Sequence, residues 1–183
     1  MKKSQKGFTI IEVALVLAVG ALIFLVVFLA VPALQRNQRN DARKRDQAQV
    51  IEAITSYIAN NPASSVALKG NTTAYDDGHV AYKNNNGVGQ NFGKYIDTLS
   101  NNTESIEIAA LKSGSDTAEG LPTNLNPTDA NEKQKLRKTM YVVPQTVCDD
   151  SHKKPVPGST RQASVIIFNE TAKGFDQLCA SAN

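Results

Sequence analysis

Residue types that often carry catalysis or bind metals are scarce in this chain. Tryptophan is absent, and the only histidines, His79 and His152, stand in no metal-ligand spacing with each other or with cysteine. There is no nucleophile elbow, phosphate loop or dinucleotide fingerprint. The acidic pairs at 76–77 and 149–150 lack the spacing of an EF-hand loop. The sequence therefore predicts no metal, no cofactor and no enzymatic activity.

A lasting excess of charge of one sign is also missing. The chain has 20 lysines and arginines against 17 acidic residues, a formal net charge of +3. Three of the basic residues, Lys2, Lys3 and Lys6, lie at the very start, so removal of that segment would leave a neutral chain. Because nucleic-acid-binding domains usually carry a basic excess, we do not expect a general nucleic-acid binder.

Cysteine is limited to Cys148 and Cys179. Two free thiols are one interpretation. If the chain is exported, an oxidising compartment favours one disulfide between them. It would close a loop of about 30 residues, and the chain-entropy estimate of its stabilisation is roughly 3–4 kcal/mol.

What the sequence does have is a long apolar run near its start. No charged residue lies between Val13 and Gln35, and about 20 apolar residues suffice to span a bilayer as a helix. Three interpretations compete: a secretory signal peptide cut near Ala33, a plain signal anchor, or a more specialised segment. The run is far longer than the apolar core of about 7–15 residues in a signal peptide.

Glu12 lies inside this apolar stretch. Ionisable side chains in membrane segments are costly and usually functional. Neither a signal peptide nor a plain anchor has a use for the carboxylate. The alternative is that Glu12 lies among lipid headgroups and is satisfied by water.

The run KGFTIIE at residues 6–12 has a short basic leader before it and an unbroken apolar segment after it. In these features, residues 1 to about 60 resemble type IV prepilins. In that family a membrane peptidase cuts after the glycine and usually N-methylates the new first residue. The resemblance implies cleavage between Gly7 and Phe8, N-methylation of Phe8, and a part in assembly for Phe8 and Glu12.

The resemblance also implies a role for the buried carboxylate. Glu12 of an incoming subunit would pair with the positively charged N-terminus of Phe8 in a neighbouring subunit. A buried carboxylate needs a partner, and two opposite charges attract strongly where water is scarce. Such a pair would fix the axial register between subunits more than it would add net stability.

The helix is expected to run from Phe8 to about Asn60, where Pro62 ends it. Gly20 and Pro32 interrupt its apolar half. The stretch between them is one hypothesis for an extensible part of the filament, and an ordinary tolerated membrane-helix proline is the other.

Beyond the apolar run, a basic cluster comes first and an amphipathic stretch follows. The cluster, which includes Arg36, Arg39 and Arg43, has three interpretations: contact with anionic headgroups before assembly, pairing between subunits with acids such as Asp41 and Asp46, and DNA binding. Apolar residues then recur on one helical face, which predicts a stripe facing a globular head. The stripe consists of Val50, Ile51, Ile54, Tyr57 and Ile58.

The rest of the chain is expected to form the head, and the fold class is α+β: a pilin fold with the long helix packed on a small antiparallel sheet. Residues 63–138 predict a mostly irregular connection with one possible strand at 105–111. Asp149–Arg161, with its prolines, predicts an exposed loop. Three clearer strands are expected at Thr139–Val147, Gln162–Asn169 and Gly174–Cys179, and the cysteines would then staple the C-terminal region.

The predicted organisation is a cleaved leader at 1–7, a transmembrane and assembly helix at 8–34, its amphipathic continuation at 35–61, and an extracytoplasmic head at 62–183. The chain is expected to be a structural pilus subunit for adhesion or motility, single-pass in the membrane and then extracellular. Its expected partners are identical subunits, the prepilin peptidase, the assembly platform with its motor ATPase, and the membrane before assembly. A minor pilin or pseudopilin of a secretion or DNA-uptake machine is the alternative within the family, and a secreted or singly anchored binding domain is the alternative outside it.

Overall fold

The computed structural model describes residues 7–60, 95–96, 99–100, 102–111 and 118–182. Two compact units divide the chain, Met1–Gln38 and Arg39–Asn183. Most of the connection predicted to be irregular lies outside the described residues, and so do His79 and the acidic pair at 76–77. The head is defined here as the described residues of the second unit.

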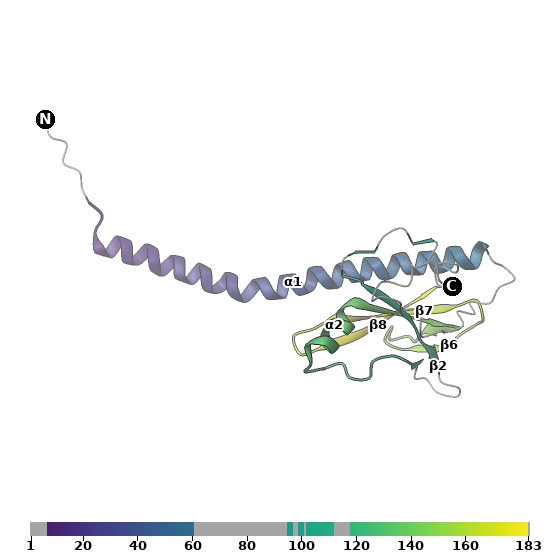
Figure 1. Ribbon diagram of the computed structural model, residues 1–183. Coiled ribbons are helices and arrows are strands. Elements are labelled where there is room, and N and C mark those ends of the chain that lie inside the picture. The colour runs from purple at the N-terminus through teal and green to yellow at the C-terminus, as the bar shows by residue number, and fades with distance from the viewer. Residues whose placement is uncertain (1–6, 61–94, 97–98, 101, 112–117, 183) are drawn as a thin grey trace. The chain divides into compact units, whose positions relative to one another are not determined.

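One long helix begins the fold, α1 (Ile10–Asn60), with 51 residues (Figure 1). It begins two residues later than predicted because Thr9 caps its first turn. It ends at the predicted residue, and Pro32 lies inside it without ending it. Within the head, the Arg161 guanidinium donates to the Ile58 carbonyl at 2.8 Å, which satisfies one of the last free carbonyls of α1.

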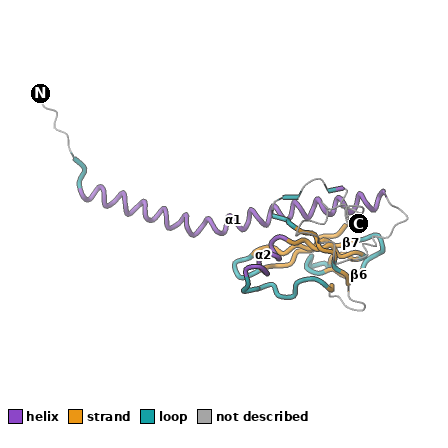
Figure 2. Tube along the Cα trace, in the orientation of Figure 1, coloured by secondary structure: helices purple, strands orange, loops and turns teal. Residues whose placement is uncertain are grey.

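The sheet of the head has four strands in the order β1-β4-β7-β8. Figure 2 draws the strands of the head in orange. The bounds are β1 (Ser105–Ile108), β4 (Thr139–Pro144), β7 (Ala163–Glu170) and β8 (Phe175–Ala182). The pairs β4–β7 and β7–β8 are antiparallel, as predicted, and the α+β pilin-like architecture is confirmed. The edge strand β1 pairs with β4 in parallel, because the chain between them crosses over through a second helix, α2 (Ala130–Lys138).

Smaller elements correct the predicted boundaries. The predicted strand Thr139–Val147 is divided at Gln145, whose φ of 58° breaks the strand into β4 and β5 (Thr146–Cys148). The predicted loop Asp149–Arg161 contains β6 (Pro155–Pro157), which pairs with β5. The possible strand predicted at 105–111 is divided into β1 and β2 (Ala110–Leu111). The connection predicted to be irregular contains β3 (Ala118–Glu119), which pairs with β2, and α2.

The helix α2 has a clear start signal that sequence reasoning missed. The Asp129 carboxylate accepts hydrogen bonds from the backbone N–H groups of Asn131 at 2.8 Å and Glu132 at 3.0 Å. This arrangement is an N-cap. Three cationic side chains in the last turn interact favourably with the negative end of the helix dipole. The helix was overlooked because it is short, polar and carries one buried apolar residue, Leu136.

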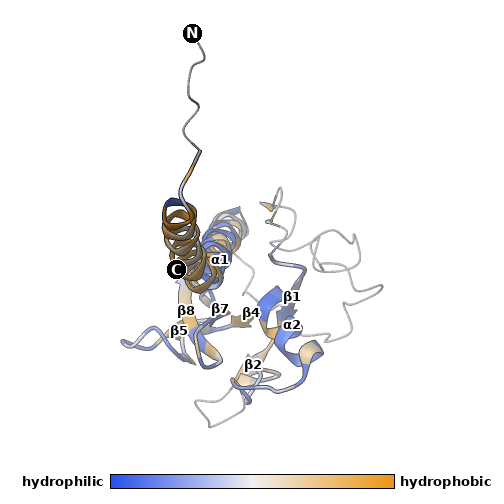
Figure 3. Cartoon of the chain, turned by 90° about the vertical axis from the view of Figure 1, so that its left-hand side faces the viewer, coloured by the Kyte–Doolittle hydropathy of each residue, from blue (hydrophilic) through white to orange (hydrophobic). Residues whose placement is uncertain are grey.

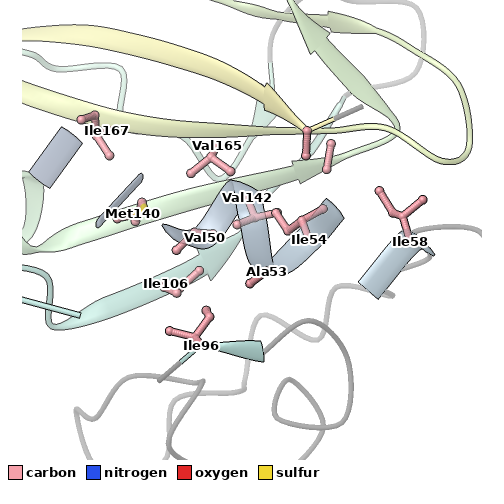
Figure 4. Close-up of a cluster of buried hydrophobic side chains, with 12 residues drawn as sticks. Val50, Ala53, Ile54, Ile58, Ile96, Ile106, Met140, Val142, Val165 and Ile167 are labelled. Atoms are coloured by element: carbon pink, nitrogen blue, oxygen red, sulfur yellow. The ribbon is translucent and has the colours of Figure 1, made fainter. Parts of the chain in front are cut away.

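Side chains alternate between the two faces of the sheet, and both faces are buried. Met140 and Val142 of β4 face α1 and pack against Val50 and Ile54 of the predicted stripe (Figure 4). On the other face, Tyr141 and Phe168 meet edge to face with ring centroids 5.8 Å apart. That second layer also contains Leu136 of α2 and Cys179.

The two cysteines are joined by a disulfide between β5 and β8. Backbone hydrogen bonds support the same junction, because the Cys179 N–H donates to the His152 carbonyl at 2.8 Å. The Cys148 N–H donates to the Ser181 hydroxyl at 2.7 Å. The segment between β5 and β6 is therefore tied to the edge strand of the sheet.

Candidate functional site

The apolar part of α1 exposes its large side chains. All the large hydrophobic residues described between Phe8 and Leu34 are exposed, by 41–89% of their surface. In Figure 3 this part of the helix is hydrophobic in colour. The most apolar window has a mean hydropathy of 3.2 and none of it is buried, and the helix is long and apolar enough to cross a membrane. Soluble monomers rarely expose an apolar surface of this extent, so this segment needs lipid or other helices around it.

The predicted cleavage site lies just before the helix. Gly7 and Phe8 are exposed and non-helical, and the helix begins at Ile10. A Cβ atom added at Gly7 would meet no atom within 4 Å. The described residues therefore give no steric reason for a glycine at this position.

Glu12 and Thr9 form a capping box at the start of α1. Glu12 Oε2 accepts hydrogen bonds from the Thr9 N–H at 2.8 Å and from the Thr9 hydroxyl at 2.9 Å. In return, the Thr9 hydroxyl oxygen accepts from the Glu12 N–H at 3.3 Å. The reciprocal bonds satisfy backbone donors that the first turn of a helix otherwise leaves unpaired. Both contacts to the carboxylate use one oxygen, and Oε1 makes no hydrogen bond to any residue that the structure describes.

The basic cluster after the apolar segment divides between the inside and the outside of the head. Lys44 and Arg45 are exposed. Arg39 forms a bidentate ion pair with Glu170 at the end of β7, with both N···O distances 2.8 Å. Asn40 donates to the Glu170 carbonyl at 2.9 Å and accepts from its N–H at 2.8 Å. Glu170 is thus held by side chain and backbone to the same turn of α1.

Arg43 is a buried cation, with 2% of its surface exposed. Its guanidinium donates to the carbonyls of Phe168 and, at 3.2 Å, of Thr139. Burial lowers the pKa of Arg43 to about 10, against the opposing attraction of Glu170 and Asp46, so the group stays charged at neutral pH. Burial acts to raise the pKa of Glu170, but the Arg39 hydrogen bond and nearby arginines outweigh it and lower that pKa.

Asp46 is occupied inside the head, which argues against its proposed pairing with another subunit. It is 3% exposed, and its carboxylate accepts from the Ser100 N–H at 2.9 Å and from the hydroxyls of Ser100 and Thr103, each at 2.6 Å. Asp41 stays exposed. The buried carboxylate anchors the segment before β1 to α1.

Sequence reasoning missed that Arg43, Asp46 and Gln47 are buried in the head. The Gln47 amide donates to the Val165 carbonyl at 2.7 Å. A signal was present, since these positions precede Val50 by seven, four and three residues and so share its helical face. They were not predicted to be buried because they are polar, and the stripe was defined by apolar residues alone. Among the described residues, no group of histidine, cysteine, aspartate and glutamate could hold a metal ion.

Comparison with known proteins gives a match at the start of the chain. Residues 2–28 match the family described as the prokaryotic N-terminal methylation motif. The match includes Gly7, Phe8 and Glu12 and ends within the apolar part of α1. No curated protein and no solved structure matches the chain.

Proposed function

We propose that this chain, which carries the hallmark motif of type IV prepilin-like proteins, is the structural subunit of a pilus filament. The observation that carries the proposal is the methylation motif at residues 2–28, which begins a helix whose apolar side chains up to Leu34 have no partner among the described residues. A filament would bury that surface by packing the helices of many subunits together. The heads would then form its outer surface, for adhesion or motility.

Processing is the first step of the proposal. A prepilin peptidase would cut between Gly7 and Phe8 and methylate the new N-terminus at Phe8. The geometry supports access, because this bond lies in an exposed segment that precedes α1. The Thr9 N–H, which the capping box uses, belongs to the peptide bond after Phe8, so the cap would survive cleavage.

Assembly is the second step, and it would use both oxygen atoms of the Glu12 carboxylate. One oxygen, Oε2, accepts both hydrogen bonds from Thr9 and so fixes the side chain at the start of the helix. The other oxygen would accept from the methylated ammonium of Phe8 in a neighbouring subunit. A carboxylate that is already ordered loses less side-chain freedom on pairing, which supports a role in setting register.

The chain would be a single-pass membrane protein before assembly and extracellular afterwards. Its partners would be identical subunits, the prepilin peptidase and the assembly platform with its motor ATPase. A minor pilin or pseudopilin would share the motif and the processing, and abundance in surface filaments distinguishes it from a major subunit.

Co-expression with a prepilin peptidase tests the processing step. We expect the chain to shorten to a Phe8 start only when the peptidase is present, and Gly7→Val to block the cut. Gly20→Val is the matched control, because a Cβ atom added at Gly20 also meets nothing within 4 Å. Cleavage of Gly7→Val at the wild-type rate, or equal loss in both variants, would overturn the assignment of Gly7.

A further inference from the structure

A cavity of about 200 Å³ opens in the head where α1, α2 and the end of β7 meet. We call it the basic cavity. Its lining residues all belong to the second compact unit and are Arg39, Arg43, Asn102, Arg137, Lys138 and Glu170. Four of the six are cations and one is an acid. The lining therefore has an excess of positive charge.

The acid in the lining does not neutralise this excess. Arg39 already contacts both carboxylate oxygens of Glu170, and Arg137 Nε approaches Oε2 of the same group at 3.4 Å. Lys138 pairs with Glu104, outside the lining. One carboxylate thus faces three arginines, and Arg137 keeps 45% of its side chain exposed.

The buried charge of Arg43 makes this excess of positive charge energetically unfavourable. Its two hydrogen bonds to described residues go to neutral carbonyl groups, although a guanidinium has five N–H donors. A buried cation without a directly bonded anion is unfavourable, because nearby carbonyl dipoles replace only part of its hydration. An anion in the basic cavity would offset this cost.

The position in the chain indicates which anion. Arg39 follows Leu34, the end of the apolar run, by about one and a half turns of helix. Cations at that place meet the headgroup layer of a bilayer, and the planar fork of arginine matches phosphate oxygens. We infer that the basic cavity binds the phosphate of an anionic phospholipid while the subunit is in the membrane. The inference rests on the membrane anchoring in the proposed function.

Native mass spectrometry of the full-length chain tests this. The purified, uncleaved protein in detergent micelles is offered equal amounts of phosphatidylglycerol and phosphatidylcholine with the same acyl chains. We expect wild type to retain the anionic lipid preferentially. Arg137→Gln should retain roughly tenfold less of it, the typical effect of one charge-assisted hydrogen bond.

The matched control is Arg45→Gln, which removes the same charge from an exposed position outside the cavity lining. It should keep the wild-type preference. Lys138→Gln serves as a second cavity variant should Arg137→Gln lose the near-ultraviolet circular dichroism of the folded head.

Four results would overturn the proposal. The first is that wild type shows no preference for the anionic lipid, and the second is that Arg137→Gln and Arg45→Gln lose equal amounts of bound lipid. The third is displacement of the lipid by an equal concentration of inorganic phosphate, and the fourth is the appearance of protein dimers that depend on Arg137, with no lipid bound. The second would show diffuse charge attraction only. The last would assign the cavity to an acidic side chain of another copy. Because the uncleaved chain is used, failure here is distinct from failure of processing or filament assembly.

Discussion

The two parts of α1 have the same backbone conformation and opposite surroundings. From Ile10 to Leu34 every large apolar side chain is exposed, whereas Val50, Ile54 and Ile58 are almost fully buried against the sheet. The difference lies in what the chain supplies as a partner. The second part packs on the protein's own β-strands, and the first part has no partner among the described residues. In the proposed function, lipid and then other subunits supply the partner of the first part.

The polar residues in the two parts of α1 also differ in their surroundings. In the first part the only acid, Glu12, caps its own helix and keeps one oxygen available among the described groups. In the second part Arg43 and Asp46 are buried and hydrogen-bonded within the head. Polar groups in the second part therefore hold the sheet and its flanking segments against α1, while one oxygen of Glu12 accepts no hydrogen bond from a described residue.

The largest expected effect is on filament assembly. Glu12→Gln keeps a side chain that can complete the capping box but removes the charge, while Glu12→Ala removes both. We expect both variants to be cleaved and inserted normally, yet to yield no or very few filaments in the sheared surface fraction. Normal filaments from Glu12→Gln would mean that the cap alone matters.

The same substitution in the two parts of α1 should differ in its effect on head stability. Ile54→Ala should lower the free energy of unfolding by about 2–5 kcal/mol, because Ile54 is fully buried. Ile23→Ala should leave it unchanged, since Ile23 is 56% exposed. Urea unfolding of the full chain in micelles, followed by tyrosine fluorescence, measures both, because all five tyrosines lie at or beyond Tyr57. Equal effects of the two variants would contradict the division of the helix.

Much of this division was predictable from the sequence, because it rests on hydrophobic length and periodicity. The apolar run, the Val50–Ile58 stripe and the antiparallel strands β4, β7 and β8 all followed from such patterns. The parallel placement of β1 did not, since register against a strand some thirty residues later depends on the crossover. The basic cavity also escaped prediction, because Glu170 and Arg39 meet only in the folded chain.

A smaller effect is expected from the buried acid that anchors the segment before β1. Asp46→Ala removes the acceptor of three hydrogen bonds and should cost about 1–3 kcal/mol, because the Thr103 hydroxyl is left buried and the Ser100 donors partly buried without an acceptor. Asp41→Ala, on the exposed side of the same helix, is the control and should change the free energy of unfolding little. An unchanged midpoint in urea for Asp46→Ala would refute the anchoring role.

The smallest expected effect is a pH dependence of head stability. The pKa of Glu170 is lowered in the folded head, so its contribution is present above its ordinary value of 4.5 and is lost as the pH falls through the folded value. Asp149 acts in the same direction, because backbone hydrogen bonds from Lys154 and Lys153 and one from the Ser151 hydroxyl lower its pKa from 3.8 to about 2.

Acid unfolding curves of Glu170→Gln measure the contribution of Glu170 to the pH dependence of head stability. The variant should be less stable than wild type at neutral pH, and it should lose less stability than wild type as the pH falls below 4.5. Glu132→Gln, an exposed acid on α2, should follow the wild-type curve. Parallel curves for wild type and Glu170→Gln would contradict the role of the Arg39–Glu170 pair.

Intact mass spectrometry of filaments sheared from the cell surface tests whether the first part of α1 is an assembly helix. The proposed function predicts an abundant chain that starts at Phe8, heavier by one methyl group and lighter by the two hydrogens lost to the disulfide. A Met1 chain that remains in the membrane, or a Leu34 chain released into the medium, with no sheared fraction, would contradict it. In either case the first part of α1 would be an anchor or a signal rather than an assembly helix.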